Sequence, residues 1–452
     1  MSVDSGDSRT ADKTGNGVVY RVLARMVDVR PRELPALLWS WGYIFTLLSS
    51  YYVMRPIRDQ MGVAGGVKNL QWLFMGTLIC MLLLNVPFGA LVKSLPRSRF
   101  IPITYRFFAV SILLFAAAFR FADPSGMVWL GRAFFIWISV FNLFVVSIFW
   151  ALIVDTFNSE DGKRLFGFIA AGATIGAITG SAVTAGLAKH IPIEALLVFA
   201  ALLLEVAVLC VRHLSRLSDA LNARPFERDR ETPIGGGVLS GITHAFRSGY
   251  LANIVLFMLL FAVTSTFIYF QQANIVSRNF ADRGAQTAFF ASIDLAVNVA
   301  TLAIQLFLTA RLARVLGVAV ALALLPLITI IGFGTLALVP TAAALMIVQV
   351  VRRSGDYGIA RPMREVLYTV VPREDRYKTK SFIDTVVYRA GDQVGAWSYV
   401  ALTGLGLGIS EIAIAGAALG VVWLVNGYWL GRRQDRLARD ERQAARTVGD
   451  TA

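Results

Sequence analysis

Charged residues are scarce in this sequence. They make up 16% of its 452 residues, against 56% that are hydrophobic, whereas soluble globular domains are about 25% charged. So little polar surface cannot cover so much apolar surface in water, which excludes a disordered hub and most soluble enzyme folds. Hydrophobic runs of about 20 residues recur along the chain, each long enough to cross a ~30 Å hydrocarbon layer. We therefore expect an all-α polytopic membrane protein.

Cysteine and histidine are also rare. The two cysteines, Cys80 and Cys210, both lie inside apolar runs, which excludes a secreted disulfide scaffold. The three histidines show no metal-ligand spacing, and the chain lacks a Walker-type glycine-rich loop followed by Lys-Ser/Thr. No Ser–His or Cys–His set lies within the apolar runs. We expect no metal, no cofactor and no enzymatic activity.

Acidic residues are outnumbered by basic ones, 29 to 43, which gives a formal charge of +14. The basic residues lie mostly in short loops between apolar runs, a distribution that the positive-inside rule explains better than nucleic-acid binding does. We expect both termini and the central charged loop to be cytoplasmic. Because no targeting segment is apparent, we expect a bacterial inner membrane.

Six apolar runs, a long charged stretch and six more runs give the expected organisation. A cytoplasmic N-terminal segment with an amphipathic helix (1–33) precedes one six-helix bundle (34–214), a cytoplasmic linker (215–248), a second six-helix bundle (249–430) and a cytoplasmic tail (431–452). The twelve expected spans lie near 34–54, 70–92, 101–119, 128–154, 165–188, 192–214, 250–271, 287–309, 315–338, 342–368, 381–404 and 412–429.

The two halves show a weak internal repeat. At an offset of 214 residues Glu160 matches Glu374 and Arg164 matches Lys378. This correspondence favours two related six-helix halves of parallel topology. The matching loops carry mixed charge on the side we expect to be cytoplasmic. They form either an ordinary solvated face or a cytoplasmic gate.

The order of six spans, charged linker and six spans resembles the major facilitator superfamily. Residues 89–97, with Gly89, Leu91 and Arg97, are similar to the signature loop after that superfamily's second helix. They depart from it at Lys93 and Pro96, where the signature has Asp and Gly. The resemblance implies a fold of two pseudo-symmetric six-helix bundles.

The chain is also similar to the ATP/ADP (NTP/NDP) exchange translocases of plastids and intracellular bacteria. The similarity lies in residues 55–59 (Arg-Pro-Ile-Arg-Asp), 149–150 (Phe-Trp) and 160–166 (Glu-Asp-Gly-Lys-Arg-Leu-Phe). The acidic residue of that family's eighth helix corresponds to Asp294, whereas its fourth-helix acid has no counterpart in 138–142. This resemblance implies nucleotide exchange, with nucleotide as cargo.

The tenth expected span holds the densest set of charged residues. Ionisable groups inside a bilayer are costly, so each is a candidate for function. Arg352 and Asp356 are four residues apart and are expected to share a helix face. A guanidinium pair at mid-depth suits a carboxylate or a phosphate, although an Arg–Asp pair that holds two helices together is the alternative. The candidate substrate-binding residues here are Gln349, Arg352, Arg353 and Asp356.

Charged residues in two further spans are candidates for the same site. In the eleventh span, Arg389 and Asp392 are three apart and either pair locally or face the tenth span. Asp294 in the eighth span has only apolar neighbours in sequence. It is either a protonatable coupling site or a structural aspartate that faces Asn298.

The expected first span ends on Arg55, Arg58 and Asp59. The two arginines either extend to the membrane interface or face the substrate, and Asp59 is a candidate coupling or gate residue. In the fifth span, Gly172, Gly176 and Gly180 form a small-residue stripe, which is typical of close helix packing.

Taken together, the residues favour a secondary active transporter that works by alternating access. The excess of intramembrane arginine indicates a small anionic solute: a nucleotide, a phosphorylated metabolite or an organic anion. Exchange and proton symport both remain open, so a proton is a candidate partner beside the lipid bilayer, and we expect a monomer. The alternative is a non-transporting receptor, assembly factor or lipid-handling protein on a transporter fold.

Overall fold

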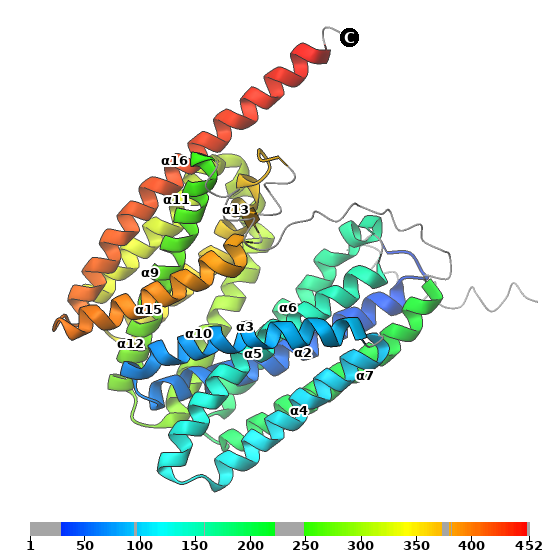
Figure 1. Cartoon of the computed structure of the whole chain (residues 1–452), viewed down its shortest axis with the longest axis vertical. Helices are drawn as coiled ribbons and strands as arrows, with labels where there is room; N and C mark the ends of the chain where they lie inside the picture. Colours follow the sequence, from blue (N-terminus) through cyan, green and yellow to red (C-terminus); the bar gives the residue numbers. More distant parts are fainter. Residues whose placement is uncertain are drawn as a thin grey trace, which may run out of the picture. The chain divides into compact units, whose positions relative to one another are not determined.

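The computed structural model of the chain describes residues 29–94, 97–157, 159–221, 248–372, 379–380 and 382–449, and these are overwhelmingly helical (Figure 1). The expected amphipathic helix at 18–30 falls almost entirely outside the described residues. The first half contributes α2 (Leu34–Ala64), the 3₁₀ turn η1 (Val67–Asn69), α3 (Leu70–Ser94), α4 (Arg97–Phe121), α5 (Pro124–Thr156), α6 (Ser159–Leu187) and α7 (Ile193–Leu221).

Two π-helical segments interrupt the helices of the second half. One divides the tenth expected span and the other opens the eleventh, and π-helical turns are frequent at functional sites. The elements are α9 (Gly249–Asn279), α10 (Arg283–Phe307), α11 (Thr309–Leu338), α12 (Ala342–Gly355), the π-helical η2 (Asp356–Ala360), α13 (Arg361–Leu367), the π-helical η3 (Ile383–Val387), α15 (Tyr388–Gly404) and α16 (Ile409–Gly449). Each expected span thus has a helix or an interrupted helix in its place, which confirms the twelve-span architecture.

Nine helices of the described part are long and apolar enough to cross a membrane by length and composition. The other three spans are α2, the interrupted α12–α13 and α15. α12 has 14 residues and ends on Arg352 and Arg353, while α2 is rich in serine, tyrosine and tryptophan. The spans with the weakest hydropathy therefore carry most of the candidate site residues.

By its contacts the chain divides into two compact units. Unit 1 comprises the described residues of Met1–Ile57, Met81–Pro124 and Trp137–Asp229, and unit 2 those of Arg58–Cys80, Ser125–Ile136 and Arg230–Ala452. In unit 1, α4 packs along α7; in unit 2, α11 packs along α16. These are the third and sixth spans of one half and the ninth and twelfth of the other. The same pairing in both halves agrees with the parallel repeat in the sequence.

Unit 2 includes one end each of α2, α3 and α5. Leu70, Leu73 and Phe135 belong to the same buried cluster as Phe270 and Val276 of α9. The hydroxyl of Tyr269 also donates a hydrogen bond to Oδ1 of Asp59 at 3.0 Å. Apolar contacts and a charge-assisted hydrogen bond therefore join these helix ends to the second half.

The helices that extend furthest beyond their expected ends are α2 and α16. α2 continues past residue 54 to Ala64 and includes Pro56, so Arg55, Arg58 and Asp59 lie within this helix rather than at the end of the span. α16 continues without interruption through the expected tail to Gly449 and extends beyond the other helices of its unit (Figure 1).

The glycine stripe of α6 lies against the backbone of α2. A Cβ atom added at Gly176 would lie 2.3 Å from the carbonyl oxygen of Phe45, and one at Gly180 would lie 2.4 Å from that of Ser49. Gly172 faces Trp41 in the same way. Only glycine permits so close an approach of the two helices.

Candidate functional site

Four arginines and two aspartates of unit 2 form a set that we call the arginine cluster. The arginines come from the end of α12 and from α13, one aspartate comes from η2, and the other comes from the facing helix α10. Its members are Arg352, Arg353, Arg361, Arg364, Asp294 and Asp356.

Asp294 is paired with Arg353. Nη1 of Arg353 lies 2.8 Å from Oδ1 of Asp294, and the two side chains are 13% and 2% exposed. The expectation that Asp294 has no cationic neighbour is therefore wrong, because its partner lies 59 residues away in sequence, on the adjacent helix. Asn298 donates to the backbone carbonyl of Asp294 at 2.8 Å.

Asp356 does not pair with Arg352, although the two are four residues apart. Its carboxylate oxygens lie 3.5 Å from Nε of Arg361 and 3.2 Å from Nη2 of Arg364. Asp356 opens the π-helical segment, and the N–H of Arg361 bonds to its carbonyl. A π-helix is hydrogen-bonded between residues five apart, rather than four. Asp356 and Arg361 are five apart, so they lie on the same face of η2 and their side chains meet.

Arg352 is 5% exposed and is held by hydroxyl groups. Its Nε donates to Oγ1 of Thr329 at 3.2 Å and its Nη2 donates to Oγ of Ser265 at 2.5 Å. Among the described residues no carboxylate oxygen lies within 4 Å of its guanidinium. Arg352 is therefore a buried cation stabilised by neutral dipoles, and the arginine cluster holds two positive charges in excess.

Polar and aromatic side chains of α9 surround Arg352. The Phe261 ring centroid lies 5.8 Å from the guanidinium carbon of Arg352 and 4.8 Å from that of Arg364, distances at which a ring face attracts a cation. One turn earlier on α12, the amide of Gln349 donates to the amide oxygen of Gln272. Both of these glutamines are buried.

Arg389 and Asp392 form the local pair that was one of the two expectations for the eleventh span. Nη1 of Arg389 lies 3.5 Å from Oδ2 of Asp392, and Thr266 of α9 donates to Oδ1 of Asp392 at 3.4 Å. The helices approach closely here, because Gly391 and Gly395 lie against α9. Neither charged group contacts the arginine cluster within salt-bridge distance among the described residues.

Arg58 and Asp59 of α2 have partners in unit 2. Nη2 of Arg58 lies 2.6 Å from Oδ1 of Asp59, and the Arg58 guanidinium lies 5.1 Å from the centre of the Phe135 ring. Arg55, which belongs to unit 1, lies over the ring of Tyr52 at 5.5 Å. These contacts hold Asp59 between Arg58 and Tyr269.

Most of the expected gate lies outside the described residues. This is true of Glu374 and Lys378, and of the side chain of Glu160. Arg164 is described, and its Nη2 lies 3.0 Å from Oε1 of Glu33, which precedes α2. Gating by these loops stays a prediction.

Arg106 and Glu205 form an ion pair between α4 and α7 in unit 1. Nε of Arg106 lies 3.4 Å from Oε1 of Glu205, and the side chains are 45% and 42% exposed. Around them the helices expose apolar side chains, among them Phe107 and Leu202. The pair therefore joins two helices that are distant in sequence.

Sequence reasoning missed the polar residues that form hydrogen bonds with the candidate site residues Arg352, Gln349 and Asp392. Ser265, Thr266, Gln272 and Thr329 lie inside apolar runs and carry no charge. The one available signal was their grouping, since Thr264, Ser265 and Thr266 are consecutive and Gln271 precedes Gln272. Among the described residues no group of three or more His, Cys, Asp or Glu side chains is placed to hold a metal ion.

Solved structures with similar folds are transporters. The nucleoside transporter NupG aligns with a TM-score of 0.58 and 15% identity, covering 88% of this chain and 98% of that one. A POT family transporter in complex with a thioalcohol-conjugated peptide aligns with a TM-score of 0.59 and 12% identity, covering 89% and 96%. A bacterial homologue of the human lysosomal transporter Spinster aligns with a TM-score of 0.53 and 13% identity, covering 90% of this chain and 99% of that one. Identities this low show the fold alone.

The sequence itself matches a family model. A comparison with curated protein sequences found no match. The model described as Major Facilitator Superfamily, however, matches residues 37–376, which is most of both expected bundles. The chain belongs to the Major Facilitator Superfamily.

Proposed function

We propose that this protein is a secondary active transporter that moves a small anionic solute across the membrane by alternating access. Membership of the superfamily and the folds of the neighbouring structures support a transporter. The anionic character of the solute rests on one observation. Arg352 is a buried guanidinium without a carboxylate partner in the described part of the chain.

Arg352 is the residue we assign to the solute. A buried charge held by two hydroxyl groups and an aromatic ring is costly, and an anion that reaches it adds a charge-assisted, two-point contact. Arg353, Arg361 and Arg364 are paired with aspartates. In this proposal they hold Arg352 in place and keep the local potential positive.

The solute is a nucleotide, a phosphorylated metabolite or an organic anion. NupG is a nucleoside transporter and the POT protein binds a peptide conjugate; neither is identical enough to this chain to select among these solutes. Asp294, paired with Arg353, has a structural role in this proposal. We retain both exchange and proton symport as coupling modes.

Orientation and location complete the proposal. The bias of basic residues towards one set of loops supports cytoplasmic termini and a cytoplasmic central loop. We place the protein in a bacterial inner membrane. A reporter fused at Gly334 or His190 is expected to be external, and a cytoplasmic signal from either would contradict this topology.

Transport by the purified full-length chain in liposomes tests the proposal. Vesicles loaded with ATP, ADP, phosphate, a sugar phosphate or a dicarboxylate receive the same labelled anion outside. An exchanger accumulates label only in loaded vesicles, whereas a proton symporter accumulates it under an inward proton gradient and stops when an ionophore is added. Arg352→Gln is expected to abolish uptake and Arg439→Gln, on the exposed end of α16, to leave it unchanged.

A non-transporting membrane protein is the second candidate. The aspartate pairing of three of the four clustered arginines favours it, because such pairs hold helices together without a ligand. If the folded protein moves none of these anions under either condition, the transporter proposal fails and this candidate replaces it.

A further inference from the structure

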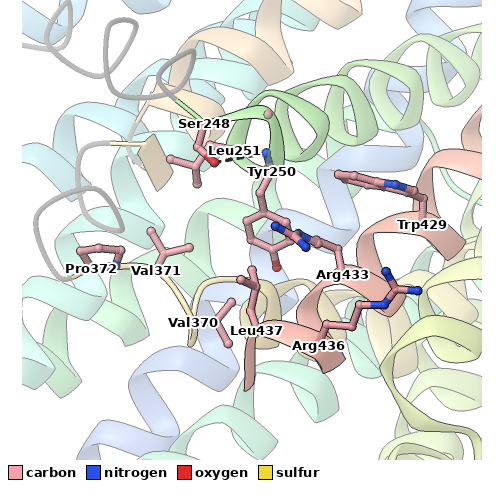
Figure 2. A pocket seen from close by; sticks show the side chains of 11 residues that line it. Ser248, Tyr250, Leu251, Val370, Val371, Pro372, Trp429, Arg433, Arg436 and Leu437 are labelled. Carbon is pink, nitrogen blue, oxygen red and sulfur yellow. Dashed lines mark hydrogen bonds between the residues drawn. The ribbon is translucent and has the colours of Figure 1, made fainter. Parts of the chain in front are cut away.

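A second basic site lies in unit 2, and its lining shares no residue with the arginine cluster. A pocket of about 490 Å³ lies between the start of α9, the segment that follows α13, and α16. Its polar lining comes chiefly from Arg433, Arg436 and Tyr250 (Figure 2). We propose that this pocket binds the phosphate-bearing headgroup of an anionic phospholipid.

The two arginines are arranged on one side of α16. Trp429, Arg433, Arg436 and Leu437 are spaced by four, three and one residues, so they share a helix face, and all four line the pocket. Among the described residues neither guanidinium has a carboxylate oxygen within 4 Å. Two arginine forks beside one cavity suit a phosphate group, which each can bind through two N–H donors.

The opposite wall fixes the shape of the pocket. Tyr250 is buried, and its hydroxyl donates to the carbonyl oxygen of Leu367 at 2.8 Å, which holds the ring in place. Figure 2 shows Arg433 and Tyr250 as two of the residues that line the pocket. The hydroxyl of Ser248 caps α9 by accepting from the N–H of Tyr250 at 3.2 Å. The positive end of the α9 dipole therefore also lies at the pocket.

The remaining lining is apolar, which favours a lipid over a free anion. Leu251, Val370 and Val371 lie on the side opposite α16 and offer a surface for glycerol and the first acyl carbons. A soluble phosphate ion has no group to place there. The pocket thus combines a cationic side with an apolar side, as the two parts of a phospholipid require.

The position along the helices also fits a lipid headgroup. The apolar part of α16 ends near Leu430, and the charged part begins at Arg432 and Arg433. Trp429 is 44% exposed at this boundary, where tryptophan is enriched in membrane proteins. Basic residues next to the end of a span attract the anionic lipids of the adjacent leaflet.

Lipid titration of the full-length protein in non-ionic detergent tests the inference. Dioctanoyl phosphatidylglycerol is the probe, native mass spectrometry measures bound lipid, and melting temperature gives a second readout. Arg433→Gln and Arg436→Gln are compared with Arg432→Gln, which removes the same charge from a neighbouring residue that does not line the pocket. Dioctanoyl phosphatidylcholine, a lipid without net charge, tests whether the negative charge of the headgroup is needed. Glycerol phosphate, which has no acyl chains, tests whether a soluble phosphate compound binds as well as the lipid.

We expect saturable binding of phosphatidylglycerol to the wild type and to Arg432→Gln with equal affinity. Each pocket variant is expected to bind roughly tenfold more weakly, the usual consequence of losing one hydrogen-bonded charge contact. Phosphatidylcholine and glycerol phosphate are expected to bind much more weakly than phosphatidylglycerol.

Four results would overturn the inference: no saturable binding; an equal loss in Arg432→Gln; equal affinity for phosphatidylcholine; or glycerol phosphate bound as tightly as the lipid. The last result would assign the pocket to a soluble phosphate compound. Arg433→Lys and Arg436→Lys keep the charge and remove only the fork, so they provide the test if the glutamine variants do not fold. They are expected to bind with intermediate affinity, and wild-type affinity in both would contradict recognition by the arginine forks.

Discussion

Arg353 and Asp294 form a buried ion pair, with Nη1 and Oδ1 2.8 Å apart, that joins α12 to α10. Removing one member of the pair takes away the opposite charge that faces the other in a largely buried place, at a cost of about 3–5 kcal/mol. We therefore predict that Arg353→Gln and Asp294→Asn each destabilise the protein strongly. The free energy of unfolding in detergent measures the effect.

The double variant separates pairing from other roles. With both charges removed, the cost is expected to be clearly smaller than the sum of the two single costs, since neither variant group is then a buried charge. Strictly additive losses would show that the two residues act independently. In that case Asp294 would again be a candidate for proton coupling.

The apolar runs and charged stretches of the sequence predicted the number and order of spans, although only nine helices of the described part are by themselves long and apolar enough to cross a bilayer. These patterns did not predict the pairing of charges. Asp294 appeared isolated because sequence neighbours do not reveal a partner on another helix. The four-residue spacing of Arg352 and Asp356 suggests a shared face only in a regular α-helix, whereas η2 is π-helical and Asp356 pairs with Arg361 and Arg364.

The partners of Arg352 were beyond sequence reasoning for another reason. Ser265 and Thr329 are ordinary residues of apolar spans, and hydroxyl groups there usually bond to the preceding turn of their own helix. Ser265 also makes this usual bond, because its Oγ donates to the backbone carbonyl oxygen of Phe261 at 2.6 Å. Only the packing of α9, α11 and α12 reveals that both hydroxyls also face one guanidinium.

The glycine stripe gives a prediction about unit 1. Gly176→Ala places a methyl group 2.3 Å from the Phe45 carbonyl oxygen, so α6 and α2 must separate, and overpacking of this kind costs about 1–3 kcal/mol. Gly186, on the same helix, has no atom within 4 Å of an added Cβ. Gly186→Ala is expected to be neutral or to stabilise by up to about 1 kcal/mol.

The melting temperatures of Gly176→Ala and Gly186→Ala, measured under the same conditions, test this prediction. A lower melting temperature for Gly176→Ala and an unchanged or higher one for Gly186→Ala is the expected pattern. Equal shifts would mean that α6 does not depend on close contact with α2.

The pair between Arg106 and Glu205 gives a prediction about charges in an apolar setting. Either single substitution to leucine leaves one partly exposed charge among apolar side chains, at a cost of roughly 2.5–3.5 kcal/mol on insertion scales. Replacing both with leucine removes both charges and is expected to be neutral or stabilising. The melting temperatures of the three variants in lipid nanodiscs test this. A double variant less stable than both single variants would contradict it.

Anion-dependent thermal stabilisation tests the central claim, that Arg352 binds the anionic group of the solute. A ligand that binds only the folded state raises the melting temperature by mass action. ATP, ADP, phosphate, sugar phosphates and dicarboxylates are each added to the wild type, to Arg352→Gln and to Arg439→Gln. We predict that at least one anion stabilises the wild type and Arg439→Gln equally and does not stabilise Arg352→Gln. Equal stabilisation of Arg352→Gln, or none of the wild type by any anion, would contradict the claim.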